Sequence, residues 1–343
     1  MTTTGVLDET YDRLADAGPE FGGWLSNHGP MAADAMVRLG RPAEVSTWLD
    51  GYVKRLEEAP ASRQPIDSDG WREPLGDPSR LGDWSAFFAR ELRSNPWEHV
   101  LARWWPRLLP GAVASAAHGL IRTGHAVRAL REQVTSARVD ELGRALGYWA
   151  ARWQLTPGLV VPVYATDAGS ALDAVPARDL TGGIRNRLAG LEDDPEWASQ
   201  LAGARPAPAP ATIPPALDTL VDTAVTGYGR WAHGNPTMLV HAATAPRAVA
   251  LVLPSLPEPL WAPSHDVAWA LAATLVSIYK PVDGAEAPAD STPAPVWEDV
   301  IDRAVAGGDE HAIKFTEVAR ESHARGNQAA LGAAARAVEL LEP

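Results

Sequence analysis

The residues with the clearest chemical potential form the run Asp309-Glu310-His311-Ala312-Ile313-Lys314 near the C-terminus. In a helix, His311 and Lys314 project from the same face. Apolar neighbours such as Ile313 and Phe315 indicate that this face is at least partly buried. Burial lowers the pKa of a lysine until its neutral amine becomes accessible. That amine is a nucleophile or, after adding carbon dioxide, a carbamate that binds a metal. A solvated lysine beside a packed histidine is the alternative.

Two upstream histidines occupy settings that also suit a metal ligand. His28 follows Asn27 at an expected helix start, where the asparagine side chain caps the first turn. His241 lies in the apolar segment 238–244, where an imidazole needs a partner. For each, a core histidine satisfied by its neighbours is the alternative. Together with His118, His311 and Lys314 they indicate a metal site.

His118 and His125 share one flank of a helix expected over 112–132. Seven residues separate them, which corresponds to roughly 10 Å along the axis. The two are therefore too far apart to bind one metal together, so at most one of them is a ligand.

One rival motif is Ser264-His265-Asp266, which is similar to the His-Asp pair of HD-type metal phosphohydrolases. His241 upstream and Asp299 or Asp309 downstream would complete such a site. The simpler interpretation is that Ser264 caps a helix whose first turn holds Asp266. Nucleotide-binding glycine fingerprints, a Walker loop, a nucleophile elbow and an H-E-x-x-H motif are absent from the sequence.

The elements expected to position these residues are almost all helices, which predicts an all-α fold: a compact multi-helix, single-domain bundle over residues 1–343 with a metal site in its helical core. Helical periodicity covers 8–17, 30–39, 43–58, 81–93, 97–108, 112–132, 138–153, 215–229, 237–252, 265–279, 298–306, 310–325 and 328–341. The segment 159–164 is a strand candidate that Pro162 confines to an edge or a loop. The Pro/Ala-rich stretches near 203–215 and 281–296 are expected to be surface connections.

Composition excludes several classes of protein and site. The net charge of −13 argues against a nucleic-acid partner, and the lack of cysteine excludes disulfides and thiolate metal sites. The N-terminus resembles no signal peptide, and the apolar stretch 267–279 is too short to span a membrane. We therefore expect a cytoplasmic protein with no membrane partner. The 14 tryptophans suit a core or the wall of a cavity.

Four runs in order along the chain resemble the questin oxidase family: Asn27–Ala32, His118–Ala126, His241–Thr244 and Asp309–Lys314. The resemblance extends from about residue 10 to residue 325. Fungal members of this family act on anthraquinones and open the central ring, and members were first described as Baeyer–Villiger-type oxygenases.

The resemblance implies a mononuclear non-haem iron site with a carboxylated lysine. Carried over motif by motif, the metal ligands are His28, His118, His241, His311 and Lys314. His125 is then the candidate catalytic residue, placed beside the metal or in the cavity wall. Imidazoles and one anionic oxygen suit Fe(II) better than magnesium or calcium. A flat substrate would stack on tryptophans, for which the candidates are Trp24, Trp104, Trp105 and Trp231.

The predicted function is therefore an iron-dependent oxygenase that uses molecular oxygen to oxidise or cleave a ring of a polycyclic aromatic polyketide, such as an anthraquinone or its hydroquinone. NADPH is an external reductant at most, and no bound flavin is expected because a dinucleotide fingerprint is lacking. The alternatives are an NAD(P)H-assisted Baeyer–Villiger-type monooxygenase, an HD-type phosphohydrolase, and a helical ligand-binding protein without catalysis.

Overall fold

The computed structural model describes residues 3–159, 168–202, 209–282 and 295–342. They are mostly helical, which confirms the predicted all-α fold. The chain divides into two compact units. Unit 1 comprises residues 1–155 and 251–257, and unit 2 comprises residues 156–250 and 258–343. The single domain predicted over residues 1–343 stays a prediction.

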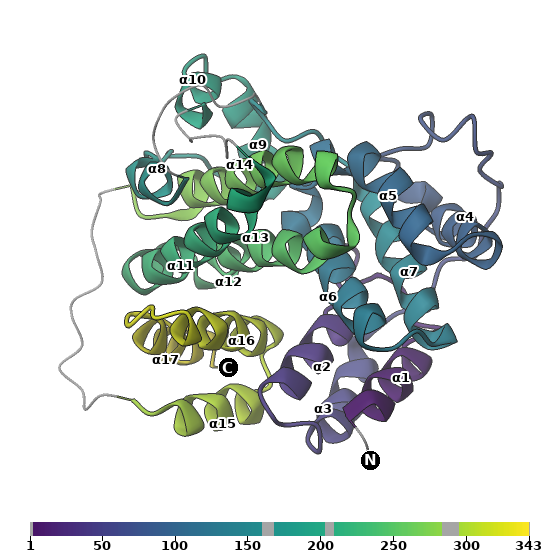
Figure 1. Ribbon diagram of the computed structural model, residues 1–343, viewed down its shortest axis with the longest axis horizontal. Coiled ribbons are helices and arrows are strands. Elements are labelled where there is room, and N and C mark those ends of the chain that lie inside the picture. The colour runs from purple at the N-terminus through teal and green to yellow at the C-terminus, as the bar shows by residue number, and fades with distance from the viewer. Residues whose placement is uncertain (1–2, 160–167, 203–208, 283–294, 343) are drawn as a thin grey trace. The chain divides into compact units, whose positions relative to one another are not determined.

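In unit 1, the helix α7 (Ser136–Arg152) packs along both α4 (Leu81–Ser94) and α6 (His118–Glu132) (Figure 1). Gly119 lets α6 approach α7 closely, since a Cβ atom at this position would lie 2.6 Å from the Trp149 Cβ. The remaining elements are α1 (Thr3–Arg13), β1 (Glu20–Phe21), β2 (Leu25–Ser26), α2 (Gly29–Arg38), α3 (Val45–Tyr52), α5 (Trp97–Leu108) and the short 3-10 helices η1 (Val53–Arg55), η2 (Pro78–Arg80), η3 (Leu109–Gly111), η4 (Ala114–Ala117) and η7 (Leu253–Ser255).

In unit 2, α11 (Ile213–Trp231) contacts α8, α14, α16 and α17, and α16 (Glu310–Ala324) packs along α17 (Ala330–Leu341) (Figure 1). The helix α14 (Trp261–Tyr279) is apolar on nearly all sides and is buried along most of its length. The other elements are α8 (Ala168–Ala174), α9 (Ile184–Glu192), α10 (Trp197–Leu201), η5 (Pro210–Thr212), η6 (Ala232–Gly234), α12 (Pro236–Leu239), α13 (His241–Val252), η8 (Glu258–Leu260) and α15 (Trp297–Gly307).

The sequence missed the short helices α8, α9 and α10 and the small hairpin of β1 and β2. Most of the strand candidate at 159–164 lies outside the described residues, as do residues 203–208 and 283–294 of the two Pro/Ala-rich connections. The first connection was predicted to extend to residue 215, but α11 already begins at Ile213.

Within the described residues, one helical stretch, Pro236–Ser255, is long and apolar enough to cross a membrane. However, 72% of its most apolar window is buried inside the structure. A core helix passes the same test, so this stretch is weak evidence for a membrane span.

Candidate metal centre

The central feature of unit 1 is a pair of buried imidazoles, His28 and His118. Their Nε2 atoms are 2.7 Å apart, and the rings stack with centroids separated by 4.5 Å. This short distance means that the two nitrogens share one hydrogen. Two nitrogens bound to the same metal, each with a bond of about 2.1 Å, lie about 3.0–3.4 Å apart. Binding of one metal through both Nε2 atoms would require this hydrogen to move to another ring nitrogen and the two Nε2 atoms to separate by a few tenths of an ångström.

His28 is fixed at the N-terminus of α2 by its neighbours. Its backbone N–H donates to the hydroxyl of Tyr52 at 2.5 Å. The Asn27 side chain accepts a hydrogen bond from the Gly29 N–H and donates to the Gly18 carbonyl. The N-cap residue of α2 is His28, whose side chain makes no capping hydrogen bond, so the expected cap by Asn27 is wrong. The Asn27 side chain instead holds the chain just before the helix.

His118 is presented by an unusual backbone segment. Ser115, Ala116 and Ala117 have φ angles of 47°, 56° and 65°, in the left-handed region that residues other than glycine rarely adopt. Each such residue costs about 1–2 kcal/mol. The predicted continuous helix over 112–132 is therefore wrong, because α6 begins only at His118. Strain of this kind is concentrated at functional sites.

The left-handed segment also determines which nitrogen of His118 is available. The Nδ1–H of His118 donates to the carbonyl of Ser115. The neutral ring then carries its lone pair on Nε2. A histidine that donates one ring N–H to a carbonyl and directs its other nitrogen elsewhere, here toward the His28 Nε2, has the arrangement found in metal-ligating histidines.

His241 in unit 2 repeats this arrangement. It is the first residue of α13, it is fully buried, and its Nδ1–H donates to the Met238 carbonyl at 3.1 Å. Its ring meets that of His311 edge-on, with centroids 5.3 Å apart. The structure thus places in contact two of the histidines that the sequence singled out as candidate ligands.

His311 lies in the first turn of α16, whose N-cap is Asp309. The Asp309 carboxylate accepts hydrogen bonds from the backbone N–H groups of His311 and Ala312, and it lies 3.7 Å from the His311 Nδ1. Burial lowers the pKa of His311, and Asp309 only partly opposes this effect. The ring is therefore held neutral, as a ligand must be.

Lys314 is fully buried one turn along the same helix. Within the described part of the chain, its Nζ has no hydrogen-bond partner. Burial lowers its pKa to about 8, against the opposing charges of Glu310 and Asp309. A buried amine without a partner is costly, and its neutral form is accessible near neutral pH. These features fit an amine that gains its missing partners as a metal-bound carbamate.

The candidate histidine ligands share one structural position: each lies at the start of a helix. His28 is the N-cap residue of α2, His118 and His241 are the first residues of α6 and α13, and His311 is the second residue of α16. The positive end of the helix dipole disfavours a cationic imidazole. These positions therefore favour neutral rings. Of these residues, His28, His118 and His311 are buried histidines that could serve as ligands of a metal ion.

His125, the candidate catalytic residue, lies in a buried ion network of unit 1. Its Nδ1 is 2.8 Å from Asp34 Oδ2, which also receives hydrogen bonds from Arg128 Nε and Nη2 at 2.9 and 2.6 Å. Although burial acts to raise it, Arg128 and His125 hold the pKa of Asp34 far below its ordinary value. Asp34 was not predicted to belong to the site. The sequence feature that could have indicated it is a carboxylate among the apolar residues of α2. The network joins α2 to α6, and the catalytic role of His125 stays a prediction.

The tryptophans proposed for a substrate pocket have different surroundings. Trp104 packs edge-to-face against Trp71, Trp84, Phe87 and Phe88 in the aromatic core. Trp105 packs against Trp149, whereas Trp24 is 69% exposed beside β2. In unit 2, Trp231 lies under the cations of Arg230 and Lys280. The structure gives Trp104 and Trp105 a role in the core, and the predicted role of all four in substrate binding stays a prediction.

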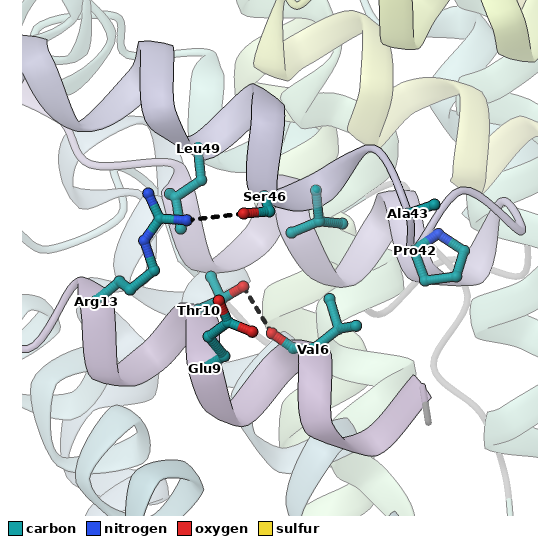
Figure 2. A pocket seen from close by; sticks show the side chains of 9 residues that line it. Val6, Glu9, Thr10, Arg13, Pro42, Ala43, Ser46 and Leu49 are labelled. Atoms are coloured by element: carbon teal, nitrogen blue, oxygen red, sulfur yellow. Dashed lines mark hydrogen bonds between the residues drawn. The ribbon is translucent and has the colours of Figure 1, made fainter. Parts of the chain in front are cut away.

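Two other features lie apart from these histidines. A pocket of about 260 Å³ separates α1 from α3, and Figure 2 shows Arg13 reaching Ser46 across it. None of the predicted ligands lines this pocket, and Arg13 is already paired with Asp50. In the rival His-Asp motif, Ser264 lies inside α14, and its hydroxyl donates to the carbonyl of Leu260, the N-cap residue. The expected cap by Ser264 is therefore wrong.

The comparison with protein families matches the part of the chain that contains the histidine pair of unit 1. Residues 25–135 match the family model described as questin oxidase-like. This segment is questin oxidase-like. It contains His28, His118 and His125, whereas His241, His311 and Lys314 lie outside the questin oxidase-like segment. The family description implies an oxidoreductase. No curated protein matches the chain.

Metal affinity should depend on pH, because bound metal must displace protons. Lys314 is protonated below its pKa of about 8, and the formation of its carbamate from bicarbonate releases one proton. With bicarbonate held constant, we expect the dissociation constant for Fe(II) to fall by about tenfold per pH unit between pH 6 and 8 for each proton released. Anaerobic calorimetry in buffers of different ionisation enthalpy measures both the dissociation constant and the number of protons released. An affinity independent of pH would contradict this prediction.

Proposed function

We propose that the protein is an iron-dependent oxygenase that oxidises or cleaves a ring of a polycyclic aromatic polyketide, such as an anthraquinone or its hydroquinone. We further propose that its iron ligands are His28, His118, His241, His311 and Lys314. The observation that carries the proposal is the buried amine of Lys314, which has no hydrogen-bond partner among the described residues and lies on the same helix as a buried neutral imidazole. The questin oxidase-like match of residues 25–135 supports the class of reaction.

The chemistry of the donor set favours iron. Imidazole nitrogens combined with one carboxylate-like oxygen suit Fe(II), whereas magnesium and calcium prefer oxygen ligands throughout. The chain has no cysteine, so sites built on thiolates are excluded. When bound, iron would supply one-electron chemistry with molecular oxygen.

The protein's own groups prepare this site. The Ser115 and Met238 carbonyls accept the Nδ1–H of His118 and of His241, which leaves the lone pair of each neutral ring on Nε2. The neutral amine of Lys314 attacks carbon dioxide, a nitrogen–carbon bond forms, and one proton leaves, which gives a carbamate anion. Burial of these groups excludes water and so strengthens their interactions with charge.

The proposed substrate is a hydroxylated quinone or its hydroquinone. A phenolate on such a ring is electron-rich and gives up electrons readily. This property removes the need for a bound flavin, and NADPH would act only as an external reductant that keeps iron ferrous. A flavin- or nicotinamide-assisted Baeyer–Villiger reaction is the alternative.

A single series of measurements tests the proposal. We expect about one iron per chain by elemental analysis after anaerobic loading, together with oxygen uptake when hydroxylated anthraquinones are added. Labelled dioxygen then distinguishes the reactions, since a dioxygenase transfers two labelled atoms to the product and a monooxygenase one. Purified protein with a flavin spectrum, or without stoichiometric metal after loading, would contradict the proposal.

A further inference from the structure

One buried phenol in unit 1 reaches both chain segments that lead into the histidine pair. The Tyr148 hydroxyl lies 2.7 Å from the Ser26 hydroxyl, and Ser26 lies two residues before His28. The Ser115 side chain also acts on this phenol, since it helps to lower the pKa of Tyr148, and Ser115 lies three residues before His118. Tyr148 also donates to Glu20 in β1 at 3.2 Å.

The segment that contains Ser115 needs such a partner. Ser115, Ala116 and Ala117 are all left-handed, so the local backbone does not hold this conformation by itself. The Ser115 carbonyl is the group that accepts the Nδ1–H of His118. A contact that fixes Ser115 therefore also fixes the direction in which His118 presents its Nε2.

Tyr148 is itself held rigidly. It lies on α7, which packs along α6 through the close contact of Trp149 with Gly119. Burial and the nearby Glu20 carboxylate keep the pKa of Tyr148 well above its ordinary value, so the phenol remains a neutral donor. Arg152 pairs with Glu20 and completes the connection between α7 and the hairpin.

We infer that Tyr148 is a positioning residue that sets the separation and orientation of His28 and His118 through the side chains of Ser26 and Ser115. This inference rests on the proposed function, in which both histidines are metal ligands. It goes further, because it assigns their geometry to a residue outside the questin oxidase-like segment.

The test compares two tyrosines of unit 1 in the full-length protein. Tyr148→Phe removes the phenol hydroxyl on which both Ser26 and Ser115 act. Tyr11→Phe is the matched control, because the Tyr11 hydroxyl is also buried but has no hydrogen-bond partner among the described residues. With Co(II) as a spectroscopic probe, we expect Tyr148→Phe to weaken binding by about 10–100-fold and to alter the visible absorption bands. Tyr11→Phe should leave both within about twofold of the parent.

A rescue experiment separates positioning from a general loss of stability. Ala116→Gly tolerates the left-handed backbone without strain and does not touch the phenol. In the Tyr148→Phe background it should restore part of the lost affinity. If Tyr148→Phe does not fold, Ser26→Ala removes the partner hydroxyl and carries the same test.

The outcomes distinguish this inference from the proposed function. If the parent protein binds neither Co(II) nor Fe(II), the proposed function fails. If the parent binds Co(II) and Tyr148→Phe matches Tyr11→Phe in affinity and spectrum, the proposed function stands and the positioning role of Tyr148 is overturned.

Discussion

Replacing Lys314 with methionine should give a protein that binds no iron but is more stable than the metal-free parent at neutral pH. Burial lowers the pKa of Lys314 from 10.5 to about 8. This shift corresponds to about 3 kcal/mol of destabilisation while the amine is protonated in both the folded and unfolded states. Methionine fills the same space without a charge, so the penalty disappears together with the ligand.

The gain in stability should itself depend on pH, and its sign follows from proton binding. Between pH 8 and 10.5, the unfolded chain holds a proton on Lys314 that the folded chain has lost. The metal-free parent therefore gains stability as the pH rises through this range. The advantage of Lys314→Met should be largest below pH 8 and should vanish above about pH 10.5. Thermal unfolding of metal-free protein at several pH values measures this difference.

Thr316 provides the control for this substitution. Its hydroxyl is fully buried on the same helix and lacks a hydrogen-bond partner in the described part of the chain. Thr316→Val should leave iron occupancy near that of the parent. Lys314→Ala should lose iron as well, and a short carboxylic acid placed in the vacated space should restore part of it. A Lys314 variant with full iron content and activity would refute the assignment.

Most long helices could be predicted from the sequence because their apolar residues recur at helical spacing. The helix α5 was predicted with its observed bounds, Trp97–Leu108. The short helices α8 and α10 have too few turns to show a period, so they were missed. The left-handed turn before His118 could not be predicted either. Glycine is the usual sequence signal for a left-handed backbone, and this turn consists of Ser115, Ala116 and Ala117.

The residues of the candidate site were recognisable from their types and their apolar neighbours. Their orientation was not. The carbonyl partners of His118 and His241 depend on backbone geometry at two helix starts. The pairing of Asp34 with His125 joins residues 91 positions apart, a contact that local patterns do not encode.

The two histidines of α6 should respond differently to removal. His118→Ala deletes an imidazole whose Nε2 lies 2.7 Å from that of His28, and we expect it to abolish iron binding. His125 lies about 10 Å further along the helix. Its Nδ1 is held by Asp34, which keeps Arg128 as a partner when the ring is removed. His125→Ala should therefore retain iron occupancy near that of the parent and lower turnover by about 10–100-fold.

Elemental analysis and steady-state oxygen uptake on both variants decide between the two histidines. Both residues belong to α6, so their removal should affect this helix similarly. Equal helix content in the two variants, measured by circular dichroism, shows that a difference in iron binding does not come from folding. The expected result distinguishes a metal ligand from a residue needed for turnover. His118→Ala should lose iron, whereas His125→Ala should turn over more slowly at full iron content. Loss of iron in His125→Ala with retention in His118→Ala would reverse the assignment. It would also make Asp34, through its contact with the His125 Nδ1, the group that orients the true ligand.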